Sequence, residues 1–297
     1  MCKRVLTIAI VLAFLLGVSG SALAANISIK KDYGTGDTIL HDQNGDKNFA
    51  NTFVMGSNNK AEIHQTGENN TAQQTQNGNS IKADIEQIGD RNRATQTQKG
   101  YSYVPWFTHR IEQTGNYNEA SQTQSGGKPN PNIAQILQYG SRNKAYQIQS
   151  DSGNDAWITQ EGNNNFAKQN QINSDNQARI FQYGDNNGST FTYMCMSPNP
   201  GYTQYQTGYR NYAWITIDGS YNQTCQWQQG EDNKVYSVIT GDRNIITQIQ
   251  KGSGNVSDIK VTGNNNKICN CQEGIGRSYS VTHTGDGWSF YIKQTGS

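Results

Sequence analysis

Glycine recurs at intervals of eleven residues along most of this chain, and no other feature constrains the fold as strongly. A fixed period of this kind is typical of repeat architectures, in which each unit stacks on its neighbours. The excess of Gln, Asn and Gly would by itself suggest disorder, but random low-complexity sequence does not hold such a register. The glycines are Gly34, Gly45, Gly56, Gly67, Gly78, Gly89 and Gly100, then, after insertions, Gly115, Gly126, Gly140, Gly162 and Gly184, and finally an unbroken series from Gly208 to Gly296.

An asparagine stands three residues after most of these glycines, as in Gly89-Asp-Arg-Asn92. Glycine and asparagine tolerate positive φ and build tight turns, so we expect the chain to reverse in each Gly-x-x-Asn arc. The alternating residues between arcs predict strands of about five residues. The expected arc residues are Gly67, Asn70, Gly89, Asn92, Gly115, Asn118, Gly140, Asn143, Gly162 and Asn165.

The true period is twice eleven, because two kinds of unit alternate. Four residues before the glycine, isoleucine alternates with glutamine until residue 180, and after residue 206 a similar alternation stands two residues before the glycine. A turn of 22 residues with two distinguishable strands explains this pattern. We therefore predict an all-β fold, a flattened parallel β-solenoid in which each turn is two strand-arc units of 11 residues.

Glutamine occupies inward positions where a strand normally carries leucine. Stacked turns bring the same residue together about every 4.8 Å, and a side-chain amide can bond to its own copies along the axis. Alanines such as Ala72 and Ala94 would let the two sheets pack closely. The expected core ladder comprises Gln65, Gln87, Gln113, Gln138, Gln160, Gln182, Gln206, Gln228, Gln250 and Gln272, with Ile63, Ile85, Ile111, Ile136, Ile158 and Ile180.

The N-terminus has the features of a secretory signal peptide. Lys3 and Arg4 precede an apolar run that ends before Ala22-Leu23-Ala24, so residues 1–24 are expected to be removed on export. Residues 25–33 form a short N-terminal segment, and residues 34–297 form the solenoid. Proline-containing insertions near 101–107, 128–132 and 194–202 are expected to be surface loops, since proline cannot sit in a central strand.

Charge and reactive residues argue against most other functions. Without Lys3 and Arg4 the chain has 22 basic and 23 acidic residues, which does not suggest a nucleic-acid binder. The four histidines lie in different turns without metal-ligand spacing, so we expect no enzyme activity, cofactor or metal site. These four histidines are His41, His64, His109 and His283.

Four cysteines follow the signal peptide: Cys195, Cys225, Cys269 and Cys271. An oxidising compartment allows disulfides, with three possible pairings. Cys225 and Cys269 lie two turns apart, about 9.6 Å, which exceeds the reach of about 7 Å between the Cα atoms of a disulfide. Cys269 and Cys271 should project from one outer face, where they could bind a metal or bridge to a neighbour. Free or locally paired thiols are the simplest expectation.

The unit Ile-x-Gln-x-Gly-x-x-Asn-x-Ala-x-x-x-Gln, written here as Ile85 to Gln98 and Ile111 to Gln124, resembles the curlin repeat of curli fibre subunits. The resemblance covers essentially the whole chain after the signal peptide. It implies a functional amyloid that is secreted through an outer-membrane channel, nucleated by a homologue at the cell surface, and polymerised into biofilm-matrix fibres. Known curlins are usually shorter and carry a glycine-rich secretion segment, which residues 25–33 lack.

Self-assembly is also expected from the strand edges, because no helical or charged cap follows Gln294 or precedes Asp32. The expected partner is a second copy of the chain, and the expected location is the extracellular cell surface. The alternative is a monomeric capped solenoid that acts as an adhesin or binds carbohydrate or ice. That function favours a regular array of Thr or aromatic residues on one face, and the outer positions here are mixed.

Overall fold

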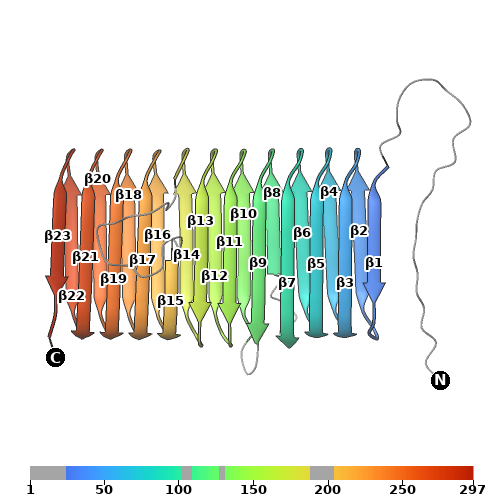
Figure 1. Ribbon diagram of the computed structural model, residues 1–297, viewed down its shortest axis with the longest axis horizontal. Coiled ribbons are helices and arrows are strands. Elements are labelled where there is room, and N and C mark those ends of the chain that lie inside the picture. The colour runs from blue at the N-terminus through green and yellow to red at the C-terminus, as the bar shows by residue number, and fades with distance from the viewer. Residues whose placement is uncertain (1–24, 102–108, 127–130, 188–203, 297) are drawn as a thin grey trace, which may run out of the picture.

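The computed structural model describes residues 25–101, 109–126, 131–187 and 204–296. These residues form 23 β-strands and no helix, arranged as one elongated stack (Figure 1). No segment in these ranges is therefore a helix that could cross a membrane. The expected signal peptide and most of the three expected loops lie outside the described residues.

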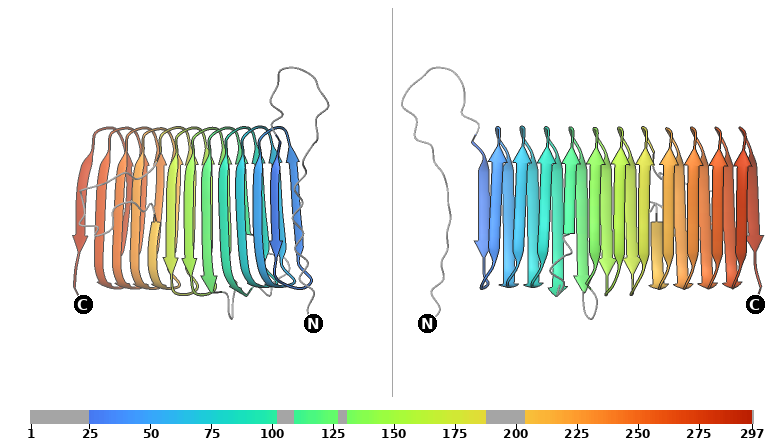
Figure 2. Two further views of the ribbon diagram at one scale, coloured as in Figure 1. Left: turned by 45° about the vertical axis from the view of Figure 1, so that its right-hand side comes forward. Right: turned by 180° about the vertical axis from the view of Figure 1, so that it is seen from behind.

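The strands form two parallel sheets, and the chain alternates between them at every arc (Figure 2). Sheet A has 12 strands: β1 (Ile27–Asp32), β3 (Phe49–Ser57), β5 (Thr71–Asn79), β7 (Arg93–Tyr101), β9 (Glu119–Gly126), β11 (Lys144–Ser150), β13 (Phe166–Ile172), β15 (Gln204–Tyr209), β17 (Gln223–Glu231), β19 (Ile245–Ser253), β21 (Lys267–Ile275) and β23 (Ser289–Gln294). Sheet B has 11: β2 (Thr38–Asn44), β4 (Lys60–Thr66), β6 (Lys82–Ile88), β8 (His109–Thr114), β10 (Ile133–Tyr139), β12 (Asp155–Glu161), β14 (Gln177–Tyr183), β16 (Tyr212–Asp218), β18 (Lys234–Thr240), β20 (Val256–Thr262) and β22 (Ser278–Thr284).

Each strand pairs in register with the strand two positions later, and outside the insertions the partner residue lies 22 residues further along the chain, as Ile85 does from Ile63. This confirms the predicted solenoid and its period. The first two insertions lengthen one turn each, so that Ile85 pairs with Ile111 and Ile111 with Ile136 without loss of register. The strands are six to nine residues long, somewhat longer than expected.

The third insertion is longer than the glycine spacing indicates. Gln171 pairs with Gln206, 35 residues later, so this turn contains 13 extra residues (35 − 22). Gln206 therefore lies in sheet A, whereas Gln182 lies in sheet B beside Ile217. The expectation that Gln206 continues the series of Gln182 is wrong. The same shift explains why the Ile/Gln alternation changes phase across this insertion.

The solenoid also starts earlier than residue 34. Strand β1 pairs in parallel with β3, with Ser28 beside Ala50, so the segment 25–33 contributes the first strand of sheet A rather than a separate tail. At the second insertion, Asn132 is buried and bonds to neighbouring turns, which makes it an arc residue instead of part of a loop.

The arcs need glycine for two reasons. Gly67 has φ of +117°, and a Cβ built on it would lie 2.2 Å from the carbonyl oxygen of Gly89 in the next turn. The second residue with positive φ is the one before the arc asparagine, such as Asn69 or Arg91, and not the asparagine itself. The arc asparagines are therefore selected for hydrogen bonding rather than for backbone conformation.

Candidate functional site

The arc asparagines form hydrogen-bonded ladders along the solenoid. The backbone N–H of Asn70 donates to Asn48 Oδ1 at 3.0 Å, and Asn70 Nδ2 donates to the carbonyl oxygen of Gly89 at 2.6 Å. Asn70 Oδ1 in turn accepts from the backbone N–H of Asn92 at 2.9 Å. Each buried amide thus ties the turn before it to the turn after it, and its polar atoms are satisfied inside the stack. The expected arc asparagines Asn70, Asn92, Asn118, Asn143 and Asn165 all lie in this ladder.

The expected glutamines fall into two different columns. Gln65, Gln87, Gln113, Gln138, Gln160 and Gln182 stack in sheet B, where each Nε2 donates to the next Oε1 at 2.8 Å. Gln206, Gln228, Gln250 and Gln272 belong to a column of sheet A, with the same bonds at 2.8–3.0 Å. A third column in sheet A runs from Gln74 to Gln248.

The glutamines also join the two sheets. Gln65 Nε2 donates a second bond to the carbonyl oxygen of Phe49 in sheet A, at 3.1 Å. The expected isoleucines Ile63, Ile85, Ile111, Ile136, Ile158 and Ile180 stack in sheet B and are at most 1% exposed. The core is therefore a mixture of amide ladders and aliphatic stacks between two closely packed sheets.

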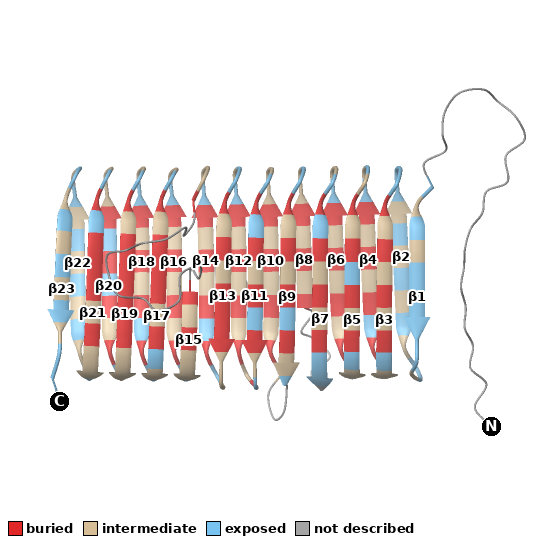
Figure 3. Ribbon diagram, viewed as in Figure 1, coloured by how far each residue is buried: buried red, intermediate tan, exposed pale blue. Residues whose placement is uncertain are grey.

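The outermost strands at both ends of the stack are not covered in the same way as the buried interior strands (Figure 3). In the interior, inward side chains are buried, but β1, β2, β22 and β23 consist of exposed and half-buried residues. Their outer edges carry backbone N–H and C=O groups that no described strand pairs. Such edges are templates for a further strand.

At the N-terminal end, two polar residues complete the arc ladders. Asn26 Oδ1 accepts from the backbone N–H of Asn48 at 2.9 Å, and Asp37 Oδ1 accepts from that of Asn59 at 2.6 Å. His41 takes an inward place and contacts Ser28 Oγ and Thr52 Oγ1 at 2.8 and 2.7 Å. Burial lowers the pKa of His41 to about 4, and the charge of Lys30 acts in the same direction.

At the C-terminal end, Arg277 and Trp288 occupy the positions of arc asparagines. Their backbone N–H groups donate to Asn255 and Asn266 Oδ1 at 2.9 and 2.8 Å. An arc asparagine accepts a hydrogen bond from the backbone N–H of the next turn through its Oδ1. The side chains of Arg277 and Trp288 have no oxygen that could accept such a bond. The ring of Trp288 stacks between His283 and Phe290, with centroids 4.3 and 4.8 Å apart. The sequence alone could have indicated this change in the ladders, because the residue three places after Gly274 and after Gly285 is not asparagine.

The histidines do not form a site. His109 lies beside Ala83 in sheet B and is buried, which lowers its pKa to about 4. His64 lies on the outer face near Asp42. Within the described ranges, no group of three or more His, Cys, Asp or Glu residues is placed to hold a metal ion.

The cysteines differ in state. Cys269 is disulfide-bonded, whereas Cys225 and Cys271 are free thiols. Burial raises the pKa of Cys225 to about 11, so this thiol is unreactive at neutral pH. Cys269 and Cys271 lie on the outer side of β21, where Cys269 packs against Ile249 and neighbouring apolar residues. Cys195 lies outside the described residues.

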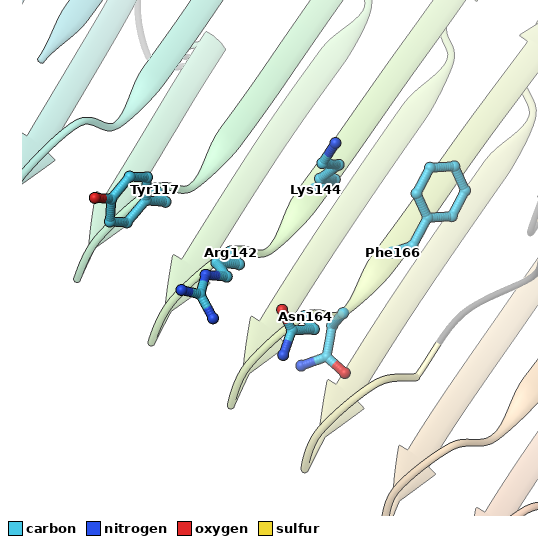
Figure 4. Close-up of a pocket in the computed structure, with 6 residues that line it drawn as sticks. Tyr117, Arg142, Lys144, Asn164 and Phe166 are labelled. Carbon is cyan, nitrogen blue, oxygen red and sulfur yellow. The ribbon is translucent and has the colours of Figure 1, made fainter.

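The outer surface carries aromatic and charged clusters. Arg179 lies over the rings of Trp157 and Trp214, 5.0 and 5.8 Å from their centroids. A depression of about 430 Å³ follows successive arcs and is lined by Tyr117, Arg142 and Phe166, among others. Figure 4 shows these side chains in order along the stack, with Arg142 on the arc next to that of Tyr117. Neither feature contains a converging acid, base and nucleophile.

The fold defines this protein as a parallel β-solenoid of stacked 22-residue turns. No protein-family model matches the chain, and no curated protein matches it either.

Proposed function

We propose that this protein is a secreted structural subunit that assembles end to end into curli-like amyloid fibres of the biofilm matrix. The observation that carries the proposal is the contrast between an interior crossed by amide ladders and open strand edges at both ends of the stack. An added molecule would extend both sheets by backbone hydrogen bonds.

Ladder direction supports the same function. Wherever two stacked glutamines bond to each other, the Nε2 of one residue donates to the Oε1 of the next residue along the chain, for example from Gln250 to Gln272 and from Gln272 to Gln294. Gln98 is an exception, because neither atom of its side-chain amide has a partner. At the ends of the stack, this direction leaves Gln43 Oε1 as an acceptor on the N-terminal side and Gln294 Nε2 as a donor on the C-terminal side. Unlike surfaces that fit each other produce open filaments instead of closed dimers.

The proposed partners follow from the resemblance to curlins and from the expected signal peptide. They are further copies of this chain, a nucleating homologue, and an outer-membrane secretion channel. The expected location is the cell surface, where the fibres would hold cells together or attach them to a substratum. No catalytic role is proposed.

The test uses residues 25–297, purified unfolded and diluted into buffer. We expect a lag and then growth of thioflavin fluorescence, shortening of the lag by preformed fibres, and a diffraction spacing of about 4.8 Å along the fibre. A folded monomer that stays soluble at high concentration, even with seeds, would contradict self-assembly as the intrinsic activity.

A monomeric capped solenoid is the second candidate, and one observation favours it. Trp288 and Arg277 interrupt both asparagine ladders at the C-terminal end, and the stack of His283, Trp288 and Phe290 covers part of the core there. Sedimentation of the refolded chain distinguishes the two: a capped adhesin gives one species of monomer mass at every concentration.

A further inference from the structure

The number of strands determines how a second copy can continue the coil. Sheet A has 12 of the described strands and sheet B has 11, with β23 as the outermost strand of sheet A. The chain alternates between the sheets, so the next place in the coil after β23 lies in sheet B, beside β22. A strand that enters this place belongs to the first half-turn of an incoming molecule.

We propose that successive molecules join through a half-turn about the fibre axis, so that sheet A of one molecule continues as sheet B of the next. The incoming β1 then pairs with β22, and the incoming β2 pairs with β23. This inference rests on the proposed self-assembly and adds the geometry of the contact. The partner is a second copy of this chain, and it binds at the end of the stack formed by β22 and β23.

The simpler contact, in which each sheet continues as itself, leaves a gap. If the incoming β1 paired with β23, the incoming β2 would lie one strand away from β22, and sheet B would lack a strand at every contact. The backbone groups facing that gap would be unpaired inside the fibre, which is costly. The half-turn fills every place in both sheets.

The arcs fix the register of the half-turn contact. Asp37 and Trp288 occupy equivalent arc positions, directly before β2 and β23. Residue 38 then lies beside residue 289, which places Gln43 next to Gln294 and Asp42 next to Lys293. Gln294 ends a glutamine column, and Gln43 begins one. The amide ladder therefore continues across the contact in the same direction.

Charge also favours the half-turn. Lys293 and Asp42 are exposed outward residues, so the contact pairs opposite charges. In the alternative contact, β1 lies on β23 and Lys293 faces Lys31, a like-charge pair that destabilises adjacent strands. In the same half-turn contact, the pairing of the incoming β1 with β22 places Asp32 beside His283. The Nε2 atom of His283 is buried without a hydrogen-bond partner in the single molecule.

Charge reversal at Lys293 separates the two contacts because they predict opposite effects. Lys293→Glu faces Asp42 in the half-turn contact, and we expect the critical concentration for assembly to rise by about fivefold. The double variant Asp42→Lys/Lys293→Glu restores the pair and should return the value to that of the wild type. Lys31→Glu, which would face Thr282, is the matched control and should change the value little. The critical concentration is measured by pelleting fibres at equilibrium.

Each other outcome overturns the half-turn. A lower critical concentration for Lys293→Glu or Lys31→Glu would show that Lys293 meets Lys31. No change in either Lys293 variant, with assembly intact, would show that these side chains do not meet. If the wild-type chain forms no fibre, the proposed function fails first and the half-turn fails with it.

Electron microscopy of the fibres gives a second readout. A stack of 23 strands, two per turn, has an axial length of about 55 Å at a rise of about 4.8 Å per turn. A half-turn between molecules makes the outer surfaces repeat every two molecules, so we expect an axial repeat of about 110 Å. A repeat of one molecule, without rotation, would contradict the proposal.

Discussion

The two halves of sheet B hold the same inward position with different chemistry. From β2 to β14 this position is a continuous glutamine column that ends at Gln182, whereas β16, β18 and β20 carry Ile217, Ile239 and Val261 there. The backbone register is the same in both halves. The coil therefore does not need amides at this position to stack. What the amides add is a bond from each turn to the next, which penalises a shift of register.

The largest effect is expected from placing an amide in the aliphatic half. Ile239→Gln removes a fully buried side chain between Ile217 and Val261, and its amide finds no glutamine above or below. We expect a loss of about 3 kcal/mol in the free energy of unfolding. Guanidinium denaturation of the folded chain measures it. A loss below that of a conservative aliphatic change would mean that this half tolerates amides equally well.

The reverse exchange in the polar half should cost somewhat less. Gln113→Leu removes the acceptor of Gln87 and the donor to Gln138, two bonds of 2.8 Å. The amide groups of Gln87 and Gln138 that lose these bonds remain buried, and we expect a loss of about 2 kcal/mol in the free energy of unfolding. The same denaturation experiment applies. A Gln113→Leu chain as stable as the wild type would show that the column contributes register without stability.

The polar half also contains the fully buried His109, which makes its stability depend on pH. Its folded pKa is about 4, below the ordinary value of 6.5, so the folded state holds the neutral ring. The stabilisation is complete above pH 6.5 and is lost as the pH falls toward 4, with about 2 kcal/mol lost at pH 5. His41 shifts in the same direction.

Denaturation between pH 4 and 8 tests this expectation with His109→Ala, which introduces the residue found at Ala83 in the neighbouring turn. The variant should lose part of the pH dependence and keep the part due to His41. An unchanged profile would show that His109 is not the group responsible.

The smallest effect serves as a reference for the aliphatic half. Ile217→Val keeps the shape of the stack and removes one methylene, for an expected loss of about 1 kcal/mol. Comparing its denaturation midpoint with that of Gln113→Leu shows whether a substitution destabilises the polar half more than a conservative change destabilises the aliphatic half. Equal losses would remove the distinction between them.

Most of the fold could be predicted from the sequence, because the glycine spacing and the 22-residue alternation specify strands, arcs and stacking together. The position of Gln206 could not, since the glycine spacing gives the distance from Gly184 to Gly208 without showing that it is one unit of 11 plus 13 extra residues. The strand β1 was also missed, because its charged residues do not alternate like an interior strand.

Of the candidate site, the inward glutamines and isoleucines were identified by periodicity alone. The bonding role of the arc asparagines was not, because positive φ and hydrogen bonding select the same residue types. The special residues at the ends, Asp37, Arg277 and Trp288, stand at positions that the spacing marks as arc asparagines. Only the structure shows which bonds they keep and which they omit.

The 22-residue register has a consequence for how such a chain changes in length over evolution. A duplication or deletion of one whole turn returns every later residue to the same sheet and the same face, so the gene can gain or lose repeats by unequal recombination while the protein keeps its shape. A change of 11 residues instead exchanges the two outer surfaces for all that follows. Length variants among natural homologues should therefore differ by multiples of 22 residues within the coil, with other differences confined to the insertions.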